Sequence, residues 1–509
     1  MEITHRQAPL SSTFGWEAGA GFPAAFLIST IQRQVRNQPV LPPALALGPT
    51  PTTRNRLRGA RFSRLQQAQE IPKQGAGVMA EVGMLQTAYK ADSASAPAVS
   101  DPEQPYGAPA LPTPLPGFRL WTLDFRLWTL DYAMIYLDHN ATTPVLPEVF
   151  EAMRPYFCEE WGNPSSAYKF GAKLKGVIET ARAQVAELIG AQPREIIFTS
   201  CATESNNAAI HAALKANPGK RHIVTSAVEH SSVLNYCLAL EKEGYRVTYL
   251  PVDRDGLLKL ADLENAVTDE TAVVSLMWAN NETGVLFPVV EIAEFCGSRG
   301  VLYHCDAVQA AGKVEIDVRK VRADYLSLTG HKFHAPKGIG ALYVQRKAGF
   351  VPLLYGGHQE GNRRGGTENV ALIAGLGRAA RLARSYLRDY EKKVRPLRDA
   401  LEEGVLVTVP NTELNGHKAQ RLANTTNIMF HGVESEALLI LLGSEGICGS
   451  SGSACLADSD EPSHVVRAMK PESAASRSMV RFSLGITNTS AEVGSVVPAV
   501  AAATRALRR

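Results

Sequence analysis

The sequence lacks the features that mark membrane, nucleic-acid-binding and disulfide-rich proteins. Its 509 residues include only seven cysteines, an odd number without close-paired spacing, which argues against a disulfide framework or structural zinc. No apolar run is long enough to span a bilayer. The net charge is only +3 and there is no basic patch, which argues against nucleic acid as a partner. We therefore expect a soluble protein of a reducing compartment, the cytoplasm, with neither a membrane nor a nucleic-acid partner.

Strands alternate with helical stretches from about Met134 onward, a pattern typical of an α/β fold with helices on both faces of a parallel sheet. Apolar periodicity predicts helices over 172–188 and 258–267. The charged stretch 384–403 is predicted to be a helix that leads into a smaller α+β region.

Composition and pattern divide the chain into three parts. Residues 1–133 are rich in proline, alanine, glutamine and serine and lack sustained periodicity, so we predict that they are disordered. Residues 134–385 are predicted to form a large domain, although 134–147 could instead pack with the small one. Residues 386–509 are predicted to form that small domain, and a cleft between two domains is a common ligand site.

Two residues suggest chemistry. Cys455 lies among glycine, serine and alanine, so we expect an exposed thiol in a mobile loop, the alternative being a buried and inert cysteine. Lys332 follows a short apolar run, where a loop amine could form a Schiff base. Neighbouring cations such as His331 and Lys337, or partial burial, would lower its pKa, and a solvated surface lysine is the alternative.

Four further segments place polar groups where an apolar run ends. The segment 195–210 predicts a strand, a turn and a helix start, an anion site that fits a phosphate. His230 could stack on a flat ring, shuttle protons or cap the next helix. Asp306, with Gln309 shortly after it, could meet a protonated pyridine nitrogen or cap a helix. Asn280 could bond a ring hydroxyl or form a turn.

Groups suited to a phosphate, a pyridinium, a phenolic oxygen and an aldehyde together describe one ligand, pyridoxal 5'-phosphate. From Met134 to the C-terminus the sequence closely resembles the cysteine desulfurases of the NifS/IscS type, within the class V group of aminotransferase-fold enzymes. The motifs that carry this resemblance are Tyr136-Leu-Asp-His-Asn-Ala-Thr-Thr-Pro144, Gly162-Asn-Pro-Ser-Ser166, Thr199-Ser-Cys-Ala-Thr-Glu-Ser-Asn-Asn207, Asn280-Asn-Glu-Thr-Gly284, Gly330-His-Lys332, Arg364-Gly-Gly-Thr-Glu-Asn369 and Ser451-Gly-Ser-Ala-Cys455.

The resemblance implies fold type I, in which a large domain with a mixed, mostly parallel seven-stranded sheet binds the cofactor. A smaller α+β domain would bring in Cys455 and Arg481. Lys332 would hold the cofactor as an internal aldimine, Cys455 would be the sulfur-accepting nucleophile, and Arg481 would clamp the substrate carboxylate.

The resemblance also implies the cofactor contacts. His230 would stack over the pyridine ring. Asn280 would bind the substrate together with Arg481. Asp306 would pair with the ring nitrogen, and Gln309 and Asn280 would contact the phenolic oxygen and neighbouring substrate. The phosphate would be bound by Ala202, Thr203, Thr329 and His331. In a homodimer, Thr367 would reach the phosphate from the partner subunit.

The implied reaction takes sulfur from L-cysteine and gives L-alanine and a persulfide on Cys455. The long loop around Cys455 resembles that of desulfurases that deliver sulfur directly to an iron-sulfur scaffold protein. Cys455 could contact an iron-sulfur cluster during that transfer, but no residue is expected as a metal ligand for catalysis. The stretches 358–364 and 463–473 resemble NifS, which serves nitrogenase maturation. Alternatives are a housekeeping IscS-like desulfurase, a selenocysteine lyase and a catalytically silent scaffold.

Two positions depart from the family pattern. Cys201 stands where many relatives have glycine, and Tyr168 stands where many have histidine. Neither is expected to do chemistry, although Cys201 adds a second thiol near the phosphate. The source of the thiolate at Cys455 stays open between His230, the proton balance of the substrate thiol, and loop motion.

The extension before Met134 ends in a tandem repeat, Phe118-Arg-Leu-Trp-Thr-Leu-Asp124 followed by Phe125-Arg-Leu-Trp-Thr-Leu-Asp131. Three interpretations compete: an organelle transit peptide, a tethering arm whose aromatic repeats bind a partner, and upstream sequence that precedes a natural start at Met134. We favour the third, because the family resemblance begins at Met134.

Overall fold

The structure is a computed structural model that describes residues 134–451, 463–471 and 477–508, all within one compact unit of the chain, Arg119–Arg509. Cys455 and the extension 1–133 lie outside the described residues, so the predictions for them stay predictions. Within the described ranges, no helix combines the length and the apolar character needed to cross a membrane.

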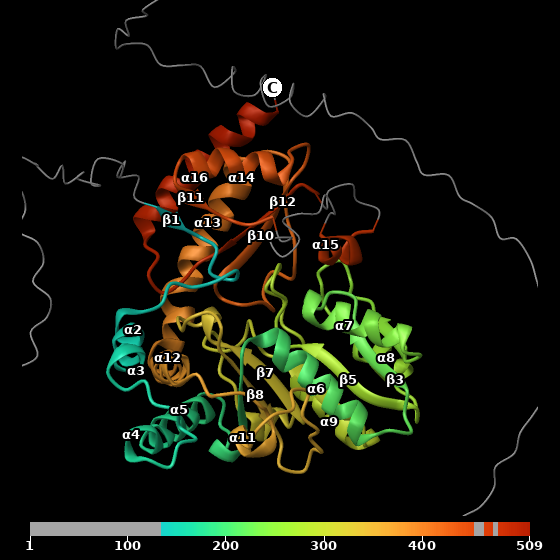
Figure 1. The fold of residues 1–509 in the computed structure, drawn as a ribbon. Helices are drawn as coiled ribbons and strands as arrows, with labels where there is room; N and C mark the ends of the chain where they lie inside the picture. Colours follow the sequence, from blue (N-terminus) through green and yellow to red (C-terminus); the bar gives the residue numbers. More distant parts are fainter. Residues whose placement is uncertain (1–133, 452–462, 472–476, 509) are drawn as a thin grey trace, which may run out of the picture. The chain divides into compact units, whose positions relative to one another are not determined.

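A seven-stranded sheet forms the centre of the described unit (Figure 1). Strand β8 is antiparallel to both of its neighbours, and all other pairs are parallel. The prediction of a mixed, mostly parallel seven-stranded sheet is therefore confirmed. In sheet order the strands are β2 (Ile196–Thr199), β8 (Gly340–Val344), β7 (Tyr325–Thr329), β6 (Leu302–Asp306), β5 (Thr271–Met277), β3 (His222–Ser226) and β4 (Arg246–Leu250).

Helices cover both faces of this sheet, because alternate strand residues point to opposite sides. Ile196 and Phe198 pack into one apolar cluster, with residues of α5 (Leu174–Leu188), α8 (Leu260–Ala266), α9 (Val289–Arg299) and α12 (Val370–Asp389). Ile197, between them, packs into a second cluster with residues of α6 (Ala202–Ala216) and α7 (Ser231–Lys242). Strands buried on both faces explain the continuous apolar runs in the sequence.

The predicted helices are present with shifted ends. Helix α5 matches the prediction for 172–188, and α8 matches that for 258–267. The predicted helix 384–403 is instead the end of α12, a π-helical turn η4 (Tyr390–Val394) and the start of α13 (Arg395–Thr408). The proposed domain boundary at 385/386 falls inside α12, and the division into two domains stays a proposal.

The C-terminal elements gather at one end of the unit around a three-stranded antiparallel sheet, with β1 among them (Figure 1). Strand β1 (Ile135–Tyr136) pairs in parallel with β11 (Ile447–Cys448), so the start of the described chain packs against its C-terminal part. The other elements here are β9 (Thr412–Leu414), β10 (Thr425–Phe430), β12 (Met479–Ser483), α14 (Ser435–Ser444), α15 (His464–Met469) and α16 (Ser490–Leu507). Short helices elsewhere are α2 (Pro147–Met153), α3 (Pro155–Cys158), α4 (Lys169–Ala172), η2 (Pro193–Glu195), α10 (Val318–Val321), η3 (Gly330–Lys332) and α11 (Gln359–Asn362).

A strained segment is tied to β2 by a buried ion pair. Glu360 has a φ of 49° and Asn362 a φ of 65°, a left-handed conformation that side chains other than glycine rarely adopt. The Glu360 carboxylate accepts two hydrogen bonds from Arg182, of 2.6 and 2.8 Å, and a third of 2.9 Å from the N–H of Phe198. This pair fixes the strand that leads to the start of α6.

Candidate active site

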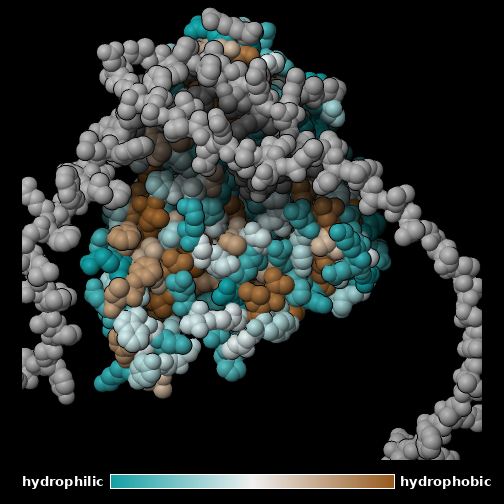
Figure 2. All heavy atoms as spheres, turned by 45° about the horizontal axis from the view of Figure 1, so that its top comes forward, coloured by the Kyte–Doolittle hydropathy of each residue, from teal (hydrophilic) through white to brown (hydrophobic). Residues whose placement is uncertain are grey.

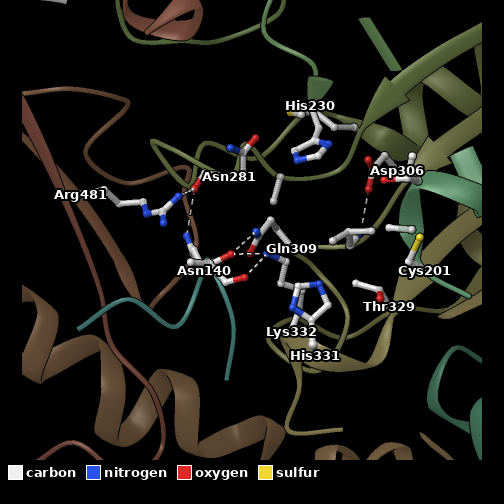
Figure 3. A pocket seen from close by; sticks show the side chains of 16 residues that line it. Asn140, Cys201, His230, Asn281, Asp306, Gln309, Thr329, His331, Lys332 and Arg481 are labelled. Atoms are coloured by element: carbon white, nitrogen blue, oxygen red, sulfur yellow. Dashed lines mark hydrogen bonds between the residues drawn. The ribbon is translucent and has the colours of Figure 1, made fainter. Parts of the chain in front are cut away.

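A cavity of about 340 Å³ opens at the carboxyl ends of the parallel strands, where α/β sheets usually bind ligands (Figure 3). Figure 3 shows Arg481 and Asn281 on one side of it and Asp306, Cys201 and Thr329 on the other. The lining residues are Asn140, Ala141, Cys201, Ala202, Thr203, His230, Met277, Ala279, Asn281, Asp306, Val308, Gln309, Thr329, His331, Lys332 and Arg481. Most residues predicted from the sequence are therefore brought together.

The positive end of α6 faces this cavity. Cys201 is the residue before the helix, has extended backbone, and makes no side-chain capping bond. Ala202 and Thr203 begin the helix and line the cavity, as do Thr329 and His331. The first N–H groups of a helix and its dipole favour an anion, so this wall suits the phosphate predicted there.

Asp306 ends β6 inside the cavity and is nearly buried. Its Oδ1 accepts a bond of 3.0 Å from the N–H of Val308, and its Oδ2 accepts one of 2.8 Å from Asn206. The sequence left a helix cap as the alternative, but residues 307–313 form turns and no helix begins there, so the bond to Val308 closes a turn. Because both hydrogen-bond partners are neutral, this carboxylate suits a cationic ligand atom such as a protonated pyridine nitrogen.

His230 likewise combines the two roles that the sequence left as alternatives. It is the N-cap of α7 and lines the cavity. Its Nδ1 accepts the N–H of Ser232 at 3.2 Å, and a backbone N–H can only donate, so the neutral ring carries its proton on Nε2. Burial, reinforced by the charges of Lys332 and His464 and opposed by Asp306, lowers the pKa of His230. The ring is therefore neutral near pH 7.

A hydrogen-bond chain joins these two groups through Asn206, which the sequence had not singled out. Asn206 Nδ2 donates to Asp306 Oδ2 at 2.8 Å and to Ser232 Oγ at 2.9 Å. Ser232 Oγ lies 2.9 Å from His230 Nδ1. Asn206 belongs to the quoted motif 199–207, and that membership is the signal that could have identified it.

Lys332 reaches the cavity from η3, directly after β7. Its Nζ donates to the carbonyl oxygens of Asn140 and Ala141, at 2.6 and 2.7 Å. The expectation that His331 is a neighbouring cation is wrong. Burial, together with the charges of Lys332 and Lys337, lowers the pKa of His331 to about 3, so its imidazole is neutral.

Asn280 is not among the residues that line the cavity, and its predicted contact with cofactor and substrate stays a prediction. Its Oδ1 accepts the N–H groups of Glu282 and Thr283, each at 2.9 Å, and its Nδ2 donates to the carbonyl of Val228 at 3.0 Å. This is the turn that the sequence left as the alternative. The neighbouring Asn281 lines the cavity instead.

Arg481 reaches the cavity from β12. Its Nη1 donates to the carbonyl of Asn281 at 2.8 Å, and its Nη2 donates to Asp138 Oδ1 at 2.6 Å. Its Nε is buried and has no hydrogen-bond partner among the described residues. An oriented guanidinium with unused N–H groups suits a carboxylate ligand.

The described residues on both sides of 452–462 contact the walls of this site. On one side, the backbone of Ser450 pairs with that of Arg481. On the other, Ser463 Oγ donates to the buried Glu282 at 2.6 Å, and His464 Nε2 lies 2.9 Å from the carbonyl of Glu229, the residue before His230. Cys455 itself lies in the segment between them.

Thr367, the last of the predicted contacts, is exposed and does not line the cavity. Its predicted role across a subunit boundary stays a prediction. Cys201 lines the cavity, as expected for a thiol near the phosphate wall. Asn140 belongs to the motif 136–144 and had no predicted role, although its carbonyl accepts hydrogen bonds from both Lys332 and Gln309.

The residues present fit pyridoxal phosphate, because they supply an amine, a buried carboxylate with neutral partners and a helix start in a cavity of suitable size. The protein is a pyridoxal phosphate-dependent enzyme. Residues 135–496 match the family model "Aminotransferase class-V", and the chain belongs to that family.

Similar proteins include several cysteine desulfurases. Cysteine desulfurase 2 of Trichormus variabilis is 54% identical over 363 residues, which cover 71% of this chain and 91% of that protein. Cysteine desulfurase NifS of Azotobacter vinelandii is 50% identical over 364 residues, 71% of this chain and 90% of that protein. The solved structure of a NifS-like protein has a TM-score of 0.68 and 35% identity, covering 72% of this chain and 98% of that one.

Proposed function

We propose that the protein is a cysteine desulfurase that takes sulfur from L-cysteine, releases L-alanine and holds the sulfur as a persulfide on Cys455. One observation carries the proposal: an amine, a carboxylate, an imidazole and a guanidinium converge on one cavity, and the residues flanking the Cys455 segment contact its walls. The similarity to proteins named cysteine desulfurase supports the same activity.

The chain's own residues divide the work. Lys332 is proposed to hold the cofactor covalently and then to move the proton of the substrate α-carbon. When bound, the cofactor supplies an electron sink for that carbon. Asp306 balances the charge of the ring nitrogen, and the start of α6 binds the phosphate. Arg481, oriented by Asp138, binds the carboxylate of the substrate.

Sulfur transfer requires a thiolate at Cys455. That thiolate attacks the substrate sulfur, and an S–S bond forms as the C–S bond breaks. The carbon keeps the electron pair of the broken bond and takes up a proton to become the methyl group of alanine. Because Nδ1 of His230 is engaged by the N–H of Ser232, the imidazole presents an N–H to the cavity. His230 therefore suits donation to a thiolate or a developing anion better than removal of a thiol proton.

Replacing the nucleophile tests this proposal directly. Cys455→Ala should keep the visible absorbance of bound cofactor and lose sulfide release from L-cysteine, whereas Lys332→Ala should lose that absorbance. Cys448→Ala is the matched control, since Cys448 is a half-buried thiol outside the cavity lining and should be dispensable. Mass mapping after one turnover should place the additional sulfur on Cys455. Full turnover by Cys455→Ala would contradict the mechanism, and strong preference for selenocysteine would favour a selenocysteine lyase.

A homodimer belongs to the same proposal. Large apolar side chains are exposed close together in the sequence, including Phe150, Phe157, Trp161 and Tyr168, with exposed fractions of 53, 54, 68 and 59%. Figure 2 shows that, on the face in view, apolar side chains surface in groups between polar ones. Such groups are typical of subunit interfaces. In such a dimer Thr367 would contact the partner's cofactor phosphate. A sedimentation mass of one chain at micromolar concentration would contradict this arrangement.

The sulfur acceptor is proposed to be an iron-sulfur scaffold protein, with nitrogenase maturation as the process served and the cytoplasm as the location. Its support is the similarity to a NifS protein and the glycine- and serine-rich sequence around Cys455. Transfer of labelled sulfur from the Cys455 persulfide to purified scaffold proteins tests the acceptor. Equal transfer to any small thiol would contradict a dedicated acceptor.

A further inference from the structure

A second lysine, Lys313, lies buried beside the cavity without lining it. Only 3% of its surface is exposed. Its Nζ donates a hydrogen bond of 2.8 Å to Gln309 Oε1, and among the described residues it has no carboxylate partner. A buried lysine without a counter-ion is costly, because burial disfavours its charge. This cost indicates that Lys313 serves the neighbouring cavity.

Gln309 connects this lysine to Lys332. The Nε2 of Gln309 donates to the carbonyl of Asn140 at 2.9 Å, and Lys332 Nζ donates to the same oxygen at 2.6 Å. A carbonyl can only accept, so the amide nitrogen of Gln309 must face Asn140 and its oxygen must face Lys313. The side chain therefore turns its remaining N–H, and not its carbonyl oxygen, toward the cavity that it lines.

We propose that Lys313 is a positioning residue, which occupies the acceptor oxygen of Gln309 and so fixes the amide to present an N–H donor to the bound cofactor. An anionic ring oxygen placed there would be stabilised by that donor, whereas a flipped amide would present a carbonyl and repel it. Without Lys313, Gln309 Oε1 would lose its only hydrogen bond among the described residues, and the pairing that selects one orientation would be weaker.

The charges around Lys313 agree with an amine that does not hold its proton strongly. Burial, together with the nearby charges of Lys332 and Arg481, lowers the pKa of Lys313 well below its ordinary value. Three histidines also feel its charge. Their pKa values are lowered chiefly by burial, to about 4 for His139, to about 3 for His331, and in direction for His334. Among the described residues no anionic group opposes these effects, and Lys313 keeps N–H groups that donate to Gln309 Oε1 in either protonation state.

The decisive measurement is the pH titration of the visible absorbance of the cofactor-loaded protein. A shift of about half a pH unit or more is expected for Lys313→Met, because about one hydrogen bond near the ring is lost. Binding of pyridoxal phosphate to the cofactor-free protein should weaken about tenfold. Lys313→Gln keeps an N–H donor without a charge and should retain most of the wild-type behaviour. It also serves if the methionine variant does not fold.

Two comparisons separate positioning from a purely structural effect. Lys470→Met is the matched control, since Lys470 is 4% exposed and also bonds an amide oxygen, Asn415 Oδ1 at 2.9 Å. It should lower stability and leave the absorbance titration unchanged. In a double-mutant cycle, Lys313→Met should add almost nothing to Gln309→Leu, because Lys313 acts through Gln309.

The proposal is overturned if Lys313→Met leaves both the titration midpoint and cofactor affinity at wild-type values, or if its effects add fully to those of Gln309→Leu. The inference rests on cofactor binding within the proposed function and does not depend on sulfur transfer. Sulfide release from L-cysteine is therefore a separate measurement. If wild type released no sulfide while Lys313→Met still shifted the titration and cofactor affinity, only the desulfurase activity would be refuted.

Discussion

Replacing Arg481 by lysine should weaken binding of the substrate carboxylate. The guanidinium is held in place by Asn281 and Asp138 at 2.8 and 2.6 Å, which leaves other N–H groups in a fixed plane for the substrate. A lysine keeps the positive charge but replaces the planar fork with a single ammonium. That ammonium can remain paired with Asp138 but cannot also present two parallel N–H groups to a carboxylate.

The loss can be worked from these contacts. A hydrogen bond between charged groups contributes about 1.5–3 kcal/mol, and the variant forfeits about one such bond. A loss of about 1.5–3 kcal/mol corresponds to a fall of about 13- to 160-fold in kcat/KM for L-cysteine. Because Arg481 does not contact the side of the cavity that holds Asp306 and the start of α6, the absorbance of bound cofactor should be unchanged (Figure 3).

The assay compares L-cysteine with 2-aminoethanethiol, which is cysteine without its carboxylate. Wild type and Arg481→Lys should differ by less than about threefold on the second substrate, since the lost bonds have no partner there. Arg421→Lys is the matched control, because Arg421 is 2% exposed and pairs with Glu402 at 2.7 Å, away from the cavity lining. An equal loss on both substrates would refute the carboxylate assignment and point to a structural role through Asp138.

Two further predictions concern buried acids. Burial raises the pKa of Glu229 from 4.5 to about 8, so between those values the folded chain holds a proton that the unfolded chain lacks, and stability falls as pH rises through that window. Glu229→Gln should therefore be more stable than wild type by about 3 kcal/mol at pH 7 and gain nothing near pH 4.5. A stability difference between the two proteins that is the same at both pH values in urea unfolding would contradict this. Glu360→Gln should cost about 3–5 kcal/mol, because it removes the buried counter-ion of Arg182 and leaves only the exposed Glu179. The exposed pair of Glu391 with Arg395 provides the control, since Glu391→Gln should cost less than about 1 kcal/mol in the same unfolding measurement.

The sequence predicted the sheet well because its strands are buried on both faces. All seven residues of β5 and all five of β7 are buried, and such runs are visible without any structure. The helix predicted over 384–403 was placed less well. Its charged pattern continues through the π-helical turn η4, and the hydrogen-bond register that changes there has no signature in the apolar spacing.

The site shows where pattern reasoning ends. Asn280 and Asn281 are adjacent and chemically identical, so which of them faces the cavity depends on turn geometry that the sequence does not specify. The charge of His331 depends on burial and on Lys332, both tertiary effects. Lys313 could not be predicted, because its proposed role depends on a tertiary contact. Gln309 accepts a hydrogen bond from Lys313 and donates one to Asn140, which lies far away in the sequence.

His230 caps helix α7 and Asp306 closes a turn, and both side chains also belong to the cavity. In each case a backbone N–H occupies one atom, Nδ1 of the imidazole or Oδ1 of the carboxylate. The second atom is then aimed in a defined direction, and Asn206 couples the two groups by donating to Asp306 and to Ser232. A side chain held by a backbone N–H loses rotational freedom and fixes its tautomer or charge before any ligand arrives. A bond from a nearby backbone N–H is therefore the means by which the ends of these strands orient their reactive groups, so a histidine or aspartate held in this way beside a cavity favours a functional assignment.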